Sequence, residues 1–159
     1  MSTTEKPAAG EPLARDIMTT PVVTVHPGMT VKDLVALFRE HRVGGVPVVD
    51  AHDLLVGIVT EGDLMAMDAD VQMPHYFELF DSIIYLGSQK KFREQLQKAA
   101  AATVADLMTP EPHTVAPGDP ARAAATLMAR YGFDRVPVEE GGKVVGIVTR
   151  HDIMKILGL

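Results

Sequence analysis

The sequence predicts an α/β protein, of the α+β kind, in which one short arrangement of strands and helices occurs twice. The first observation is a near-repeat: "VGIVTEGDLM" at residues 56–65 returns as "VGIVTRHDIM" at residues 145–154, with seven of ten letters identical. The second is that short β-branched runs alternate with stretches of helical periodicity on both sides of these decamers. Mixed elements of this kind, repeated in order, indicate a duplicated α/β unit.

The repeat extends well beyond the decamers. "DIMTTPVVTVHPG" (16–28) matches "DLMTPEPHTVAPG" (106–118), and "GGVPVVD" (44–50) matches "DRVPVEE" (134–140), both at an offset of 90 residues. The decamers lie at an offset of 89, so one residue is missing from the second copy between the last two segments. An offset this steady indicates tandem duplication.

The first copy is predicted to run strand, helix, strand, strand, helix. "VVTV" (22–25), "VPVV" (46–49) and "LLVGIVT" (54–60) are the strands, and "DAHD" joins the last two. Thr30 is the predicted N-cap of the first helix, and Gly44-Gly45 its predicted end. The apolar face of this helix has the spacing i, i+3, i+4 and i+7, with Val31, Leu34, Val35 and Phe38.

The second copy repeats this order with different residues. Asp119 is the predicted cap of its first helix, Pro120 takes the first helical position and Gly132 ends the helix. "RVPVEE" and "KVVGIVT" are strands that pair across Gly141-Gly142, and "RHDIMKIL" is a closing helix. The apolar stripe of the first helix consists of Ala124, Leu127, Met128 and Tyr131.

We divide the chain into a disordered tail (1–13), a first unit (14–68), a helical insert (69–102) and a second unit (103–159). Within the insert, "YFELFDSIIYL" is rich in aromatic residues, and "SQKKFREQLQKAAAA" has the pattern of a helix. Residues 88–98 carry four basic side chains against one glutamate. This basic segment is either a solvated helix face that covers the core or a surface for dimerisation or a partner.

Composition narrows the class of function. The net charge of the 159-residue chain is −6, which opposes a nucleic-acid-binding face, and no apolar stretch is long enough to span a membrane. Because the chain has no cysteine, it has neither disulfides nor thiolate sites, and its six histidines lack metal-ligand spacing. No catalytic or phosphate-loop signature is present. We expect a cytoplasmic, non-enzymatic protein.

The repeated "DIMT"/"DLMT", "TVHPG"/"TVAPG", "VPV" and "GIVTEGDL"/"GIVTRHDI" segments resemble a tandem pair of CBS domains, the cystathionine-β-synthase-type regulatory (Bateman) module. The central "MPHYFELFDSIIYLG" also resembles the insert of a bacterial subgroup of stand-alone CBS pairs. The resemblance implies two β-α-β-β-α units with pseudo-twofold symmetry, packed through their sheets. It implies regulatory ligands, an adenine nucleotide (AMP, ADP or ATP) or S-adenosylmethionine, in two clefts between the units, and a homodimer.

The two T-x-x-D pairs are Thr60 with Asp63 and Thr149 with Asp152. Capping alone would account for each, since Thr at the N-cap and Asp in the first turn both stabilise a helix start. The same geometry also offers backbone N–H groups to a phosphate and a carboxylate to ribose hydroxyls. The resemblance implies that the aspartate binds ribose and that the threonine lies near ribose or phosphate.

The resemblance assigns residues to two clefts. The first holds Met18, Val23, Val43, Gly44, Gly45, Val46, Pro47, Thr60, Asp63 and Arg135. The second holds Met108, His113, Phe133, Asp134, Val136, Pro137, Thr149, Arg150, His151 and Asp152.

The two clefts differ where "VGGVPV" corresponds to "FDRVPV". Gly44 and Gly45 either let the backbone approach a flat base or serve as a helix stop. Arg135 either reaches a phosphate held by the other unit or is an edge-strand surface charge, and Asp134 would repel an anion. We therefore predict that the Asp63 cleft binds a phosphorylated adenosine better than the Asp152 cleft.

Arg150 and His151 count against this ranking, because they precede Asp152 at a helix start and could hold phosphate there. Their alternative interpretation is a solvated surface pair. The predicted function is a sensor that binds an adenosine-type ligand and signals to a regulated protein partner through a change of shape. The alternative is an interaction scaffold with no ligand, and a nucleic-acid-associated regulator is a weaker one because the chain is acidic.

Overall fold

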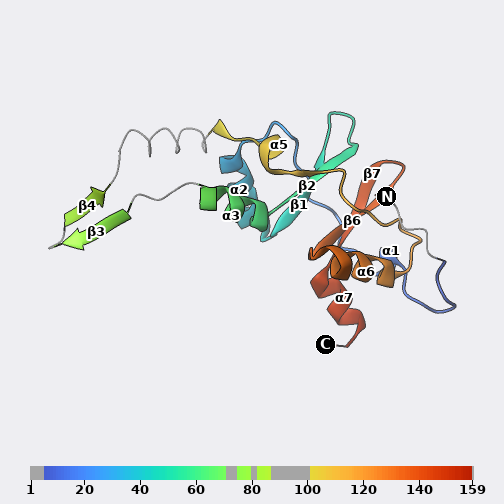
Figure 1. Ribbon diagram of the computed structural model, residues 1–159. Coiled ribbons are helices and arrows are strands. Elements are labelled where there is room, and N and C mark those ends of the chain that lie inside the picture. Colours follow the sequence, from blue (N-terminus) through green and yellow to red (C-terminus); the bar gives the residue numbers. More distant parts are fainter. Residues whose placement is uncertain (1–5, 71–74, 80–81, 87–100, 159) are drawn as a thin grey trace.

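The computed structural model describes residues 6–70, 75–79, 82–86 and 101–158, with side chains for 6–67 and 101–158 (Figure 1). The first unit contains α2 (Val31–His41), β1 (Gly45–Val49), β2 (Leu55–Thr60) and α3 (Glu61–Asp70). The second contains α6 (Ala121–Tyr131), β6 (Arg135–Glu140), β7 (Lys143–Thr149) and α7 (Arg150–Ile156). The predicted order of helix, strand, strand and helix is confirmed in both units.

Each unit is built around one antiparallel strand pair, and the two pairs match in detail. Gly45 of β1 lies opposite Thr60 of β2, and Arg135 of β6 lies opposite Thr149 of β7. Both pairs shift register at the same place, after Val48 and after Val138. Corresponding strand ends and corresponding helix starts therefore meet in the same way in both units.

The first predicted strand of each unit is reduced to a single bridge. Val25 bridges Val48 in parallel, and Val115 bridges Val138 in the same way, but neither segment forms a regular strand. Both valines are at most 1% exposed. The β-branched pattern therefore reports burial of these residues correctly, whereas the regular ladder predicted there is wrong.

The segment at the start of each unit packs on the other unit. α1 (Ala14–Ile17) lies against α6, α7 and β7, and Thr19 exchanges two backbone hydrogen bonds with Ile147, at 2.8 and 3.2 Å. In return, α5 (Val104–Leu107) and β5 (Thr109–Pro110) lie on the first unit, where β5 pairs with β2. We call residues 12–19 and 102–110 the entry segments (Figure 1).

Glycines at matching positions receive the entry segments. A Cβ added at Gly57 would lie 2.6 Å from Met108 Sδ, and one added at Gly146 would overlap Met18. The glycine in both copies of "VGIVT" is thus the place where a methionine of "DLMT" or "DIMT" crosses the strand. This contact explains why both repeats contain the glycine and the methionine.

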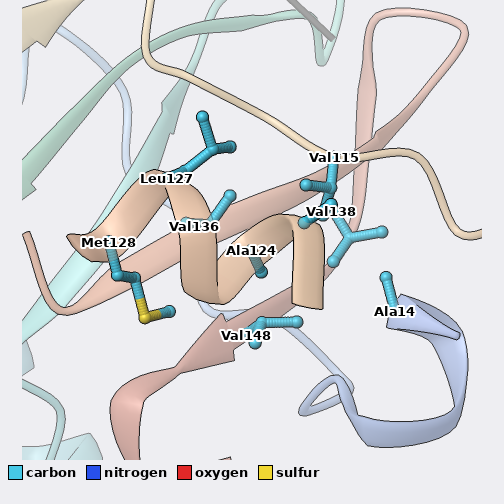
Figure 2. Packing of buried hydrophobic residues seen from close by; sticks show 9 residues of the cluster. Ala14, Val115, Ala124, Leu127, Met128, Val136, Val138 and Val148 are labelled. Carbon is cyan, nitrogen blue, oxygen red and sulfur yellow. The ribbon is translucent and has the colours of Figure 1, made fainter. Parts of the chain in front are cut away.

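The exchange is also visible in the two hydrophobic cores. Ala14 from α1 is fully buried in the second unit's core, where Figure 2 shows it beside α6 together with Val115 and Val138. Val104 from α5 is likewise fully buried in the first unit's core. The remaining first-core residues are Val25, Leu34, Phe38, Val46, Val48 and Val59. Those of the second core are Ala123, Ala124, Leu127, Met128, Val136 and Val148.

The ends of the first helices show why one prediction succeeded and another was wrong. Thr30 caps α2 as predicted, since its hydroxyl accepts a hydrogen bond from the Asp33 N–H at 3.2 Å. Gly132 ends α6 in the left-handed conformation, with φ of 75°. In α2, however, Arg42 takes that conformation, with φ of 53°, so Gly44-Gly45 is not the helix end. Gly45 already belongs to β1.

Smaller corrections concern the tail, the insert and one aromatic residue. Residues 11–13 of the predicted tail are held on the second unit, because Leu13 bridges Pro120 and Glu11 pairs with Arg122. Part of the insert is an antiparallel hairpin, β3 (His75–Leu79) with β4 (Ser82–Leu86), instead of helix. β-Branched and aromatic residues favour strands there.

Tyr131 is half exposed, so it is not part of the α6 core face. The predicted helix at 88–102 lies almost entirely outside the described residues.

Candidate functional site

The two helix starts that follow β2 and β7 carry the T-x-x-D pairs. The Thr60 N–H donates to Asp63 Oδ2 at 2.8 Å and the Thr60 hydroxyl donates to the same oxygen at 3.2 Å. Thr149 makes the same two contacts with Asp152 Oδ2, at 2.8 and 2.9 Å. Both aspartates therefore cap a helix, and in both the hydrogen bonds to threonine fall on one carboxylate oxygen, Oδ2.

The two aspartates differ in accessibility. Asp152 is 7% exposed, whereas Asp63 is only partly buried and faces a pocket. A carboxylate must reach a ligand's hydroxyl groups directly to bind them, within about 3 Å. Asp63 is therefore the better placed of the two to accept hydrogen bonds from a ligand.

The Asp63 pocket has a volume of about 430 Å³, within the range typical of small-molecule sites. Its polar side carries Thr60 and Asp63 from the first unit and Arg135 from the second. Its other walls are mostly apolar or aromatic and come from β2, from the end of the second entry segment and the residues that follow it, and from β6 and the residues just before it. These residues are Ile58, Thr109, Pro110, Glu111, Pro112, His113, Phe133 and Pro137.

Aromatic rings lie in parallel along one wall of this pocket. His113 stacks on Tyr131 with ring centroids 4.1 Å apart, and the Phe133 ring lies 6.0 Å from that of His113 at an angle of 24°. Two of the three, His113 and Phe133, line the pocket. Parallel rings beside a slot suit a flat heterocycle, because offset stacking of aromatic faces is favourable.

Arg135 crosses from the second unit to the first. Its Nη1 donates to the Gly45 carbonyl at 3.3 Å, and a Cβ added at Gly45 would lie 2.8 Å from both Cδ and Nη1 of the same arginine. At this place Gly45 therefore makes room for an arginine from the other unit instead of for a base. The Arg135 side chain is only 13% exposed.

A second pocket of about 390 Å³ adjoins the first and shares Thr60, Phe133 and Arg135 with it. It is lined by residues from both helix starts and from the segments before β1 and β6. Its charged residues are Glu61, Asp134, Arg135 and Arg150. Because they share Thr60, Phe133 and Arg135, we treat the two pockets as one candidate site, from the aromatic wall to the start of α3.

Asp134 holds the arginine that lies between the pockets. Arg135 Nε donates to Asp134 Oδ1 at 2.9 Å, and Nη2 donates to Oδ2 at 3.0 Å. These hydrogen bonds from Arg135 are the main cause that holds the pKa of Asp134 below its usual value, and the charge of Arg150 adds to the effect. Asp134 is therefore ionised at neutral pH and occupies one edge of the guanidinium.

The structure brings together residues that the sequence had assigned to different clefts. His113, Phe133 and Pro137 were assigned to the Asp152 cleft but lie in the Asp63 pocket with Arg135. Met18 and Met108 are likewise interchanged, because Met18 lies on Gly146 and Met108 on Gly57. The physical reason is the exchange of the entry segments, which periodicity within one repeat does not reveal.

Most of the other predicted residues lie away from the pockets, and two line the second pocket. Val46 and Val136 are fully buried core residues because alternate positions on a strand face opposite sides. Val23 and Val43 pack against the first core, Pro47 is fully buried, and His151 is exposed. Gly44 and Arg150 line the second pocket, while Thr149 and Asp152 cap α7.

Sequence reasoning missed several pocket residues, namely Ile58, Thr109, Pro110, Glu111 and Pro112. One of them had a signal, since Ile58 lies two positions before Thr60 on β2 and so faces the same side. The other four belong to the segment that crosses between the units. Within the described residues, no group of histidine, aspartate or glutamate side chains has the arrangement of a metal site.

Comparison with known proteins identifies the family. The sequence profile of the CBS domain matches residues 14–70 and 104–159, the two units described above. The chain belongs to the CBS-domain family. It is a tandem CBS pair, as the repeated segments predicted.

The CBS pair resembles both whole proteins and parts of larger ones. It is 31% identical to an uncharacterized protein, MJ1426, of Methanocaldococcus jannaschii over 91% of this chain and 90% of that protein. It is 35% identical to the chloroplastic CBSX2 of Arabidopsis thaliana over 82% of this chain but 56% of the relative. The match to an L-aspartate semialdehyde sulfurtransferase of M. jannaschii, at 27% identity, covers 92% of this chain and only 23% of the enzyme.

Solved structures give the same result. The crystal structure of CBSX2 in complex with AMP matches with a TM-score of 0.69 and 30% identity, over 91% of this chain and 95% of that one. The CBS domain pair of protein MJ0100, in complex with 5′-methylthioadenosine and S-adenosyl-L-methionine, matches with a TM-score of 0.71 and 26% identity over 93% and 97%. Both confirm the fold of a CBS pair. Among the helices of the described part of this chain, none has the length and apolar character to cross a membrane.

Proposed function

We propose that this CBS pair is a non-enzymatic regulatory module that binds an adenosine-containing ligand in the Asp63 pocket. The observation that carries the proposal is the composition of that pocket, in which an accessible carboxylate and an arginine face apolar and aromatic walls. Relatives crystallised with AMP and with S-adenosyl-L-methionine support the same class of ligand.

Each part of an adenosine has a matching surface in the proposed site. The adenine lies between the proline and aromatic side chains, where His113 and Phe133 offer parallel rings. The ribose hydroxyls donate to Asp63, whose carboxylate already caps α3. The 5′ substituent points toward Thr60, Arg135 and the second pocket, where backbone N–H groups begin α3.

The proposal ranks the Asp63 cleft above the Asp152 cleft. Arg135 serves the Asp63 pocket, and its equivalent in the first repeat is Gly45, which has no side chain to offer the other cleft. Asp152 is also the more buried aspartate. Because the pocket takes residues from both units, an occupant changes how they pack, and a regulated protein partner reads that change.

Thermal unfolding with candidate ligands tests this function. The midpoint is measured with AMP, ADP, ATP, S-adenosylmethionine and NAD, in the wild type, Asp63→Ala and Asp152→Ala. A ligand at about 100 times its Kd stabilises the protein by about 2.7 kcal/mol, a shift of several degrees. We expect this shift to be lost in Asp63→Ala and kept in Asp152→Ala.

The Asp152→Ala variant is a matched control because it loses the same kind of helix cap. Loss of a cap lowers stability by about 1 kcal/mol in either variant, with or without ligand. A shift that survives Asp63→Ala but disappears in Asp152→Ala would reverse the ranking of the clefts. If no adenosine compound shifts the wild type, the module is an interaction scaffold instead.

A further inference from the structure

The 5′ end of the proposed site has an unusual balance of charge. Among the described residues that line the second pocket, Arg135 and Arg150 are basic, and Glu61 and Asp134 are acidic. The formal charges therefore cancel where a phosphate would lie. A site that selected polyphosphates would need an excess of positive charge at this end.

The arrangement of these charges matters more than their sum. Asp134 makes two parallel hydrogen bonds to Arg135, at 2.9 and 3.0 Å, in the geometry by which an arginine also grips a phosphate. A third N–H of the same guanidinium donates to the Gly45 carbonyl. Of the five N–H groups of Arg135, three are thus engaged within the protein before any ligand arrives.

The carboxylate is not required by the fold. The corresponding residue of the first repeat is Gly44, which has no side chain. Yet the backbone makes the same hydrogen bond at the two positions. The Gly44 carbonyl accepts from the Glu61 N–H at 2.9 Å, and the Asp134 carbonyl accepts from the Arg150 N–H at 2.8 Å. The Asp134 side chain instead accepts two hydrogen bonds from Arg135. Its role therefore concerns the arginine.

We propose that Asp134 is a specificity-determining residue, which occupies the phosphate-binding edge of Arg135 and makes the Asp63 pocket select adenosines with a neutral or cationic 5′ substituent. Such ligands are thioether and sulfonium adenosines, represented by 5′-methylthioadenosine and S-adenosylmethionine. A phosphate must displace Asp134 or approach it as a like charge, whereas a neutral thioether or a sulfonium meets no like charge on Asp134 or Glu61. The inference rests on the proposed adenosine site.

Isothermal titration calorimetry tests the inference with four ligands: 5′-methylthioadenosine, S-adenosylmethionine, AMP and ATP. The proteins are the wild type, Asp134→Asn, and Asp134→Gly, which copies the first repeat. Glu140→Gln is the matched control, since it removes one carboxylate from the exposed far end of β6. We expect both Asp134 variants to bind AMP and ATP about tenfold or more tightly than the wild type, the value of one charge-assisted hydrogen bond. Their Kd for 5′-methylthioadenosine should change less than about twofold, since that ligand carries no charge.

The outcomes separate the inference from the function on which it rests. If the wild type binds none of the four ligands, the proposed adenosine site itself is wrong. If it binds them but the ratio of AMP to 5′-methylthioadenosine affinity in both Asp134 variants equals that in the wild type, the selective role of Asp134 is refuted. An equal gain for phosphates in Glu140→Gln would also refute it, because overall charge would then be the cause.

Discussion

Position 45 and its repeat equivalent, position 135, hold different residues that fit together: a glycine in one unit makes room for an arginine from the other. Gly45 is buried in β1, and the side chain of Arg135 lies across its backbone. Neither residue explains the other when each repeat is considered alone. Their complementarity arises because the two strand starts face each other across the unit boundary.

Replacement of Gly45 by alanine tests this complementarity. The added Cβ would lie 2.8 Å from Arg135 Cδ, so the arginine must move. We expect Gly45→Ala to lower the free energy of unfolding by about 1–3 kcal/mol, as overpacking does. The measurement is urea denaturation.

A double-mutant cycle with Arg135→Ala separates this clash from other effects of the added methyl group. The cost of Gly45→Ala should shrink in the Arg135→Ala background, because the clash has been removed. Gly28→Ala is the control, since its Cβ would meet no atom within 4 Å. An equal cost of Gly45→Ala in both backgrounds would contradict the proposed contact.

For single residues, the sequence predicted local capping contacts correctly but did not predict which distant residues share a pocket. The capping contacts of Thr60 and Thr149 followed from their spacing to aspartate, because capping is a local interaction. His113 and Phe133 were assigned to the Asp152 cleft but line the Asp63 pocket, because which pocket a side chain lines depends on segments some 50 to 75 residues away, such as those that contain Ile58 and Asp63. Residue spacing carries no information about such contacts.

At the scale of single elements, the two copies of the first helix end in different ways. α6 ends at Gly132 with φ of 75°, whereas α2 ends at Arg42 with φ of 53°. The left-handed conformation costs a residue with a Cβ about 1 kcal/mol or more, and glycine avoids that cost. The second unit therefore uses the more favourable residue at this helix end.

Substitutions at the two helix ends, Arg42 and Gly132, should change stability in opposite directions, so each serves as a control for the other. Arg42→Gly should raise the free energy of unfolding by up to about 1 kcal/mol, and Gly132→Ala should lower it by a similar amount. Both are measured as changes in the urea midpoint at constant slope. A loss of stability in Arg42→Gly would show that the arginine side chain contributes more than its backbone conformation costs.

Elements with strong local signals were predicted well, and elements that depend on distant partners were not. The helical stripe that begins at Val31 and the Gly141-Gly142 turn were recognisable, since periodicity and turn residues act within a few positions. Residues 22–25 look like a strand but make one bridge, because a strand also needs a neighbour along its whole length. The end of α2 was misplaced because arginine is a rare residue for that conformation.

For the molecule as a whole, exposed apolar residues on the last helix of each unit point to a further contact. Met65 on α3 is 68% exposed, and Met154, at the equivalent position on α7, is 41% exposed. Leu157, just after α7, is 67% exposed. A surface that the pseudo-twofold repeat presents twice is suited to an isologous interface, so we propose that a second copy of this chain covers it.

The mass in solution tests this assembly. Light scattering on a sizing column should give about twice the chain mass of 17.2 kDa. Met65→Glu and Met154→Glu should each shift the population toward the monomer, because a charge would be buried in the interface. Ala36→Glu, on an exposed position of α2, adds the same charge elsewhere and should leave the mass unchanged. A wild-type mass of 17.2 kDa at micromolar concentration would refute the dimer.

The exchanged entry segments have a consequence for how such a module can be inherited and divided. If the chain is divided between the two sequence repeats, each half keeps an entry segment that packs on the other half. One half keeps residues 12–19, which belong on β7, and the other keeps 102–110, which belong on β2. The unit that evolution copied is therefore not the unit that is physically complete. Each half carries what the other lacks, and the smallest self-sufficient piece of this protein is the pair.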